Sequence, residues 1–111
     1  MEFPAFMTAF PSLDLPLSED IVSTHALRTE QGLAVFFEVH QDFTLPPHAH
    51  KAQWGTVLAG EMDLTMDGQT RTIRPGDTYS IPAGTEHGVS IKAGTRILDV
   101  FEEPDRYPLK A

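Results

Sequence analysis

The sequence predicts an all-β fold, either a sandwich or a barrel. Runs of roughly four to eight β-branched, aromatic and aliphatic residues recur about every ten residues, with turn residues between them. Nine Pro and eight Gly punctuate the 111 residues and leave few stretches long enough for a helix. A chain of this length is enough for one domain and too short for two.

The predicted strands follow one another from Ile21 onward. The run from Leu33 to His40 is rich in residues that favour strands. Residues 61–67 alternate strictly between polar and apolar side chains, as in a strand with one buried face. Asp67-Gly68 then predicts a tight hairpin turn, because Asp and Gly tolerate the positive φ that such turns require. The remaining predicted strands are 69–73, 78–81, 89–92 and 96–101.

The first segment, from Met1 to Pro16, is apolar but interrupted by three prolines. Proline lacks a backbone donor and breaks helices, so we expect an extended arm over residues 1–20 with at most a short helical turn. The barrel then occupies residues 21–111 and ends in a short irregular tail. The large apolar side chains of the arm are Phe3, Phe6, Met7 and Phe10.

The arm needs a surface that covers these side chains, because each one left in water forgoes roughly 1.5–3 kcal/mol. We expect a barrel of this size to fill its interior with its own strands, which leaves an outer surface for the arm. The prediction is a homodimer in which the arm and the outer sheet share the interface, with Trp54 and Leu58 receiving the arm. The alternative is a monomer whose arm closes one mouth of its own barrel.

The composition excludes several classes of function. There is no Cys, so neither a disulfide nor a thiolate metal site is possible. The net charge of −8 argues against nucleic acid or an anionic membrane as a partner. No run approaches the roughly 18 apolar residues of a membrane-spanning helix. The N-terminus lacks the basic start of a signal peptide, and we expect a cytoplasmic location.

Two of the five histidines have a spacing that suits a metal ion. His48 and His50 are two residues apart, so on a strand their imidazoles would point to the same face. Pro46-Pro47 before them would hold the backbone extended. Such a pair is weak evidence when taken alone, and His25 and His40 carry no predicted function.

The surroundings of this pair resemble the cupin superfamily in two motifs. The first motif is His48-Ala-His50-Lys-Ala-Gln53-Trp-Gly-Thr-Val-Leu-Ala-Gly60, and the second is Gly76-Asp-Thr-Tyr-Ser-Ile-Pro82-Ala-Gly84-Thr-Glu-His87. With the strand and turn rhythm, the resemblance extends over roughly residues 21–102. It implies a jelly-roll β-barrel in which His48, His50, Gln53 and His87 hold one divalent metal ion.

The chain departs from the family pattern at the fourth ligand. That ligand usually lies four or five residues after the second His, where Trp54 cannot ligate. Gln53 keeps the family's six-residue spacing to Gly60, and alternation counted back from Gly60 places Gln53 inside the barrel and Trp54 outside. A plain hydrogen-bonding role for Gln53 stays open. Ile91 replaces the Asn that often ends the second motif, which predicts a more apolar cavity floor.

The predicted ligand set restricts the metal and its partner. Three neutral imidazoles and an amide bring no charge, so we expect an anionic group from the ligand or substrate to complete the site. Nitrogen and oxygen donors suit Fe, Ni, Mn, Zn or Cu, whereas Ca and Mg prefer more oxygens. An open position would let the ion act as a Lewis acid on a carbonyl or hydroxyl.

A narrower resemblance points to the small cupins of pectin and alginate breakdown, which linearise unsaturated uronate monomers. These share the His, His, Gln, His set and carry an Asp-x-Phe followed by an Arg, matched here by Asp99-Val-Phe101 and Arg106. The resemblance implies that Asp99 is the acid/base, Phe101 a pocket wall and Arg106 a grip on a carboxylate. Alternation puts Asp99 on the face of Phe101, where burial would raise its pKa. The alternative is a solvated Asp99 and a surface Arg106.

The resemblance therefore implies a metal-binding cupin that acts on a small anionic carbonyl or sugar-acid substrate by Lewis-acid and acid–base chemistry, as an isomerase-like or lyase-like enzyme. Two alternatives stay open, since fold does not fix function. One is an Fe-dependent dioxygenase, and the other is a non-catalytic module that binds a small ligand. An acid/base residue near the metal would favour an enzyme, and an inert cavity would favour a binding module.

Overall fold

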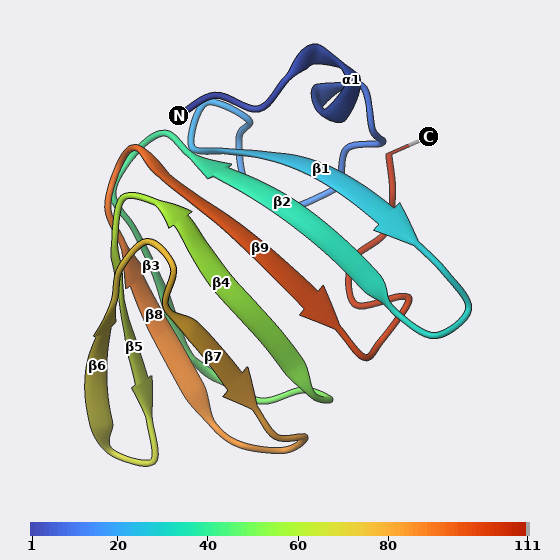
Figure 1. Ribbon diagram of the computed structural model, residues 1–111. Helices are drawn as coiled ribbons and strands as arrows, with labels where there is room; N and C mark the ends of the chain where they lie inside the picture. Colours follow the sequence, from blue (N-terminus) through green and yellow to red (C-terminus); the bar gives the residue numbers. More distant parts are fainter. Residues whose placement is uncertain (111) are drawn as a thin grey trace.

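The computed structural model describes residues 1–110, and antiparallel strands account for nearly all of the regular secondary structure in this range (Figure 1). Within this range the elements are α1 (Ala5–Thr8), β1 (Val22–Arg28), β2 (Leu33–Val39), β3 (Phe43–His48), β4 (Gln53–Ala59), β5 (Met62–Met66), β6 (Gln69–Ile73), β7 (Thr78–Ile81), β8 (His87–Ile91) and β9 (Thr95–Phe101). No helix in the described range is long and apolar enough to cross a membrane.

The strands form two sheets, in the orders β1-β2-β9-β4-β7 and β3-β8-β5-β6. The chain repeatedly crosses from one sheet to the other, as between β2 and β3, β3 and β4, and β7 and β8. This is the predicted all-β jelly-roll fold. The crossings bring the end of β3, the starts of β4 and β8 and the end of β9 to the lower end of the molecule in Figure 1.

Two turns show how the sequence fixes the register. Asp67 and Gly68 have φ values of 53° and 75°, so the predicted hairpin turn joins β5 to β6. Gly60 has a φ of 79°, and a Cβ on it would lie 2.4 Å from Thr95 Oγ1. Only glycine fits there without strain, and Gly60 therefore anchors the β4 end from which the alternation was counted.

Alternating side chains of both sheets form the core between them. On β9, Thr95, Ile97, Asp99 and Phe101 are buried while the residues between them face outward. The main apolar cluster lies between the two sheets and consists of Val57, Met62, Leu64, Ile73, Tyr79, Ile81 and Ile97. Burial of each aliphatic side chain contributes roughly 1.5–3 kcal/mol to stability.

The N-terminal arm folds back on its own barrel. The helical turn α1 agrees with the predicted short turn, and Phe3 is buried on the outer face against His25 and Phe36. Leu13 bridges to Leu109 of the C-terminal tail in antiparallel fashion. These contacts tie both ends of the chain to the β1 edge of the larger sheet.

The expectation that the whole arm lies on an outer surface is wrong. Leu15 and Leu17 line the interior cavity together with Val22, Phe43 and Leu45. The physical reason is that β1 and β3 are both edge strands, so the strands alone do not close the barrel on that side. The second half of the arm fills the gap with aliphatic side chains.

Candidate metal centre

Three histidines converge at the end of the barrel where β3 ends and β8 begins. His48 is the last residue of β3 and is paired directly with His87, the first residue of β8. The ring centroids of His48 and His50 lie 5.2 Å apart, and those of His48 and His87 lie 4.4 Å apart. The potential ligand atoms of all three lie within 4.8 Å of one another.

His50 reaches this cluster by a different route from the one predicted. The strand ends at His48, and the pairing of β3 with β8 is irregular between Leu45 and His48, where Pro46-Pro47 lies. Proline cannot donate to a ladder, so β3 departs from regular pairing just before the site. His50 therefore sits beyond the strand, yet its ring joins the same cluster.

Hydrogen bonds fix the same tautomer in all three rings. The Nδ1 atoms of His48, His50 and His87 lie 3.0, 2.7 and 2.9 Å from the carbonyl oxygens of Pro46, Lys51 and Thr85. A carbonyl oxygen only accepts, so each Nδ1 carries a proton, and in the neutral form of such a ring Nε2 is the atom with the free lone pair. The Nε2 atoms are therefore the ones available to a metal ion, with each Nδ1 held by a backbone carbonyl, as is usual for metal-ligating histidines.

Burial favours the neutral state of two of these rings. It lowers the pKa of His50 and of His87 below the ordinary value of 6.5, although hydrogen bonds to backbone carbonyls oppose that shift. The neighbouring Arg106 also lowers the pKa of both rings. Protons therefore compete less with a metal ion for these two imidazoles near neutral pH.

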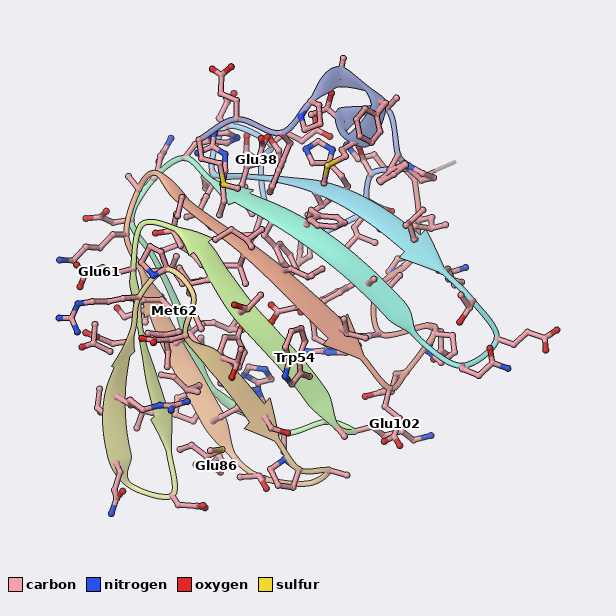
Figure 2. All side chains as sticks on the ribbon, viewed as in Figure 1. Glu38, Trp54, Glu61, Met62, Glu86 and Glu102 are labelled. Atoms are coloured by element: carbon pink, nitrogen blue, oxygen red, sulfur yellow. The ribbon has the colours of Figure 1, made fainter. Side chains whose placement is uncertain are left out.

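Gln53 and Trp54 point to opposite sides of β4, as the alternation predicted. Gln53 lines the cavity that contains the three histidines, whereas Trp54 is 42% exposed and labelled in Figure 2. Hydrogen bonding from the Gln53 side chain lowers the pKa of Asp99. If the amide nitrogen donates to Asp99, the amide oxygen is free to face the histidines.

Asp99 is buried in the same cavity, so the alternative of a solvated Asp99 is wrong. Its side chain accepts a hydrogen bond from the Tyr79 hydroxyl. Burial raises the pKa of Asp99 from 3.8 to about 6, against the opposing hydrogen bonds from Tyr79 and Gln53. A carboxyl group with such a pKa can both accept and donate a proton near neutral pH.

Sequence reasoning missed Tyr79, which stands in β7 between two turns. A Cβ at Gly55 of β4 would lie 2.2 Å from Asp99 Oδ1 and 2.3 Å from the Tyr79 hydroxyl. The missing side chain of Gly55 therefore makes room for the contact between Tyr79 and Asp99. The signal in the sequence was an isolated glycine inside a strand, which often marks a close approach of other groups.

Phe101 lines the cavity, and Arg106 lies just outside it. Phe101 is buried, and its ring centroid lies 5.8 Å from that of His50. The Arg106 guanidinium lies over the Tyr107 ring at 4.6 Å. Arg106 also lines a separate shallow depression with Lys51 and with His50, which borders the cavity as well. Arg106 is half-buried, and its Nε has no hydrogen-bond partner among residues 1–110.

The family of the chain follows from a comparison of sequences. The family model described as "Cupin domain" matches residues 35–101, which is more than half of the chain, and the protein belongs to this family. No curated protein matches the chain in sequence.

Solved structures show the same fold at low sequence identity. An RmlC-like cupin from Shewanella frigidimarina has a TM-score of 0.76 and 23% identity, and the match covers 96% of this chain and 94% of that one. KdgF from Halomonas sp. has a TM-score of 0.67 and 23% identity, with coverage of 81% and 86%. Oxalate decarboxylase from Bacillus subtilis, which has Mn(II) centres, has a TM-score of 0.63 and 18% identity, with coverage of 79% and 28%.

Proposed function

We propose that the protein is a metal-dependent cupin enzyme that acts on a small anionic carbonyl or sugar-acid substrate. The observation that carries this proposal is one cavity that holds both a cluster of three histidines and a buried carboxyl group. His48, His50 and His87 bring potential ligand atoms together at one end of it, with each Nδ1 held by a backbone carbonyl. Asp99, whose pKa is about 6, is buried beside them.

The residues of the cluster fit a divalent transition metal. Three imidazole nitrogens with free lone pairs, and an amide oxygen from Gln53, are donors that suit Fe, Ni, Mn, Zn or Cu. Such an ion supplies Lewis acidity to a carbonyl or hydroxyl group when it is bound. The donor set carries no negative charge, so an anionic substrate is favoured over a neutral one.

Residues of the chain supply proton transfer, a pocket wall and binding of the substrate carboxylate. The Asp99 carboxyl moves a proton, and Tyr79 and Gln53 orient it by hydrogen bonds. Phe101 forms the wall beside His50. The Arg106 guanidinium just outside the cavity binds a substrate carboxylate, for which its planar donors are suited.

The presence of Asp99 favours an enzyme over a non-catalytic binding module. A buried carboxyl group costs stability, and a binding site for an anion has no use for a second negative charge. An Fe-dependent dioxygenase needs the same histidines, and the identity of the bound metal separates it from the proposal.

The test combines metal analysis with a substrate screen. Elemental analysis of the purified protein identifies the ion, and small carbonyl acids, including unsaturated uronates, are then screened for turnover. Asp99→Asn keeps the shape of the side chain but cannot exchange a proton, so we expect turnover to fall by at least about 100-fold. A turnover rate that Asp99→Asn leaves unchanged would contradict the role of Asp99.

We also propose that the protein forms a homodimer through the outer face of the larger sheet. Leu27, Ala34, Val100 and Trp54 stand opposite one another across β1, β2, β9 and β4. Leu27, Val100 and Trp54 are 46%, 38% and 42% exposed, and Phe6 of the arm is 72% exposed. An apolar row of this kind is typical of a surface that a second copy covers.

A further inference from the structure

The cavity that contains the three-histidine cluster is polar at the end where the histidines lie and apolar along the rest of its depth. On β8, His87 lies at the polar end, and Val89 and Ile91 line the cavity further in. A strand rises about 3.3 Å per residue, so Ile91 lies about 13 Å along β8 from His87. Leu45 and Phe43 of β3 pair with Val89 and Ile91 and also line the cavity.

The cavity-lining residues of the facing sheet also change from polar to apolar with increasing depth. On β9, Asp99 lines the polar end and Ile97 lies one inward position deeper. Tyr79, which donates to Asp99, is the deepest polar side chain on β7. Beyond these two groups, the cavity lining within residues 1–110 is entirely apolar, and Leu15 and Leu17 of the arm complete it.

A ligand that reaches into this part of the cavity meets no hydrogen-bonding side chain. Each hydroxyl group placed there would lose its water without a replacement partner, which weakens binding by about 5- to 150-fold. The cavity volume is about 170 Å³, similar to cavities that hold a benzene-sized molecule. The space therefore fits a short hydrocarbon group and disfavours a polyhydroxylated chain.

We propose that the substrate is a carboxylate with a short unsubstituted hydrocarbon tail, such as a medium-length 2-oxo acid, rather than a polyhydroxylated sugar acid. This inference rests on the proposed function and adds the substrate class. The head group lies among His48, His87 and Asp99, and the tail extends between Val89 and Ile97. Ile91, which replaces the Asn frequent in the family motif, makes the floor apolar and selects for such a tail.

The test is isothermal titration of the Zn²⁺-loaded protein with 2-oxo acids of increasing length: pyruvate, 2-oxobutanoate, 2-oxopentanoate and 2-oxohexanoate. Each added methylene is expected to tighten binding about fourfold until the cavity is full. The matched polar pair is gluconate and 2-hydroxyhexanoate, which have the same six-carbon 2-hydroxy acid skeleton without a ketone that could close into a hemiketal ring, and differ by the hydroxyl groups on the tail. We expect gluconate to bind at least about 100-fold more weakly than 2-hydroxyhexanoate.

Two variants test the tail pocket itself. Ile91→Asn should remove most of the gain in affinity with tail length, and should weaken the binding of 2-oxohexanoate more than that of pyruvate. Val89→Phe fills the pocket without adding a polar group, so it should weaken the binding of 2-oxohexanoate more than the binding of pyruvate. This variant replaces Ile91→Asn if that protein does not fold. Ser90→Asn is the matched control, because Ser90 faces outward on the same strand, and it should leave every affinity unchanged.

The outcomes separate this inference from the proposed function. Binding of every acid with an affinity independent of tail length, or tighter binding of gluconate than of 2-hydroxyhexanoate, would overturn the apolar tail and leave the proposed function standing. Failure of all the acids to bind, pyruvate included, would overturn both.

Discussion

Replacement of Asp99 by Asn should make the metal-free protein more stable at neutral pH. Burial raises the pKa of Asp99 from 3.8 to about 6, so the folded state favours the protonated carboxyl. Stability from this group is fully present below pH 3.8 and is lost as pH rises to about 6. The shift corresponds to about 3 kcal/mol at neutral pH. Asn has nearly the same shape, stays neutral, and keeps an oxygen for the Tyr79 hydroxyl.

The assay is thermal and urea unfolding of the wild type and Asp99→Asn between pH 4 and 8, in the presence of a chelator. The variant should gain about 3 kcal/mol over the wild type at pH 7, or about 10 °C in Tm, and the gain should vanish near pH 4. The exposed Asp105 supplies the control Asp105→Asn, which should change stability by less than about 0.5 kcal/mol. A variant less stable than the wild type at pH 7 would refute the reasoning, since Asp99 would then contribute to the fold as an anion.

Three further predictions concern the cluster, the Gly55 contact and the arm. Because burial lowers the pKa of His50 and His87 below 6.5, bound metal should be retained at pH 6.5 and lost as pH falls further. Metal analysis after dialysis measures the occupancy, and full occupancy at pH 4 would be incompatible with histidine ligation. Gly55→Ala should cost about 1–3 kcal/mol by overpacking Tyr79, and an unchanged urea midpoint would contradict the close contact. Light scattering should show a dimer that weakens when residues 1–16 are removed, whereas a full-length monomer at micromolar concentration would exclude the dimer.

Local sequence signals predicted most of the fold. Asp67-Gly68 fixed a hairpin, because the φ values it needs are available to few other pairs. Gly60 set the register of β4, and the alternation counted from it placed Gln53 inside and Trp54 outside. On β9 the same alternation put Asp99 on the face of Phe101. These features depend on backbone geometry and on period-two patterning, both of which are readable from a single chain.

The features that sequence reasoning missed depend on contacts between distant segments. The Tyr79 hydroxyl reaches Asp99 only because Gly55, on a third strand, has no side chain. Leu15 and Leu17 line the cavity because two edge strands leave one side of the barrel open. His50 lies beyond its strand because pairing becomes irregular at Pro46-Pro47. Neither propensity nor spacing encodes such arrangements.

The central claim is that His48, His50 and His87 hold one transition-metal ion. The most direct measurement is the metal content of the purified protein after loading with Zn²⁺ and gel filtration, for the wild type and for His48→Ala and His87→Ala. His40→Ala is the control, because His40 is exposed and lies outside the cluster. We predict one equivalent of metal in the wild type and in His40→Ala, and a loss of most of it in the other two variants. Equal metal content in all four proteins, or none in any of them, would contradict the claim.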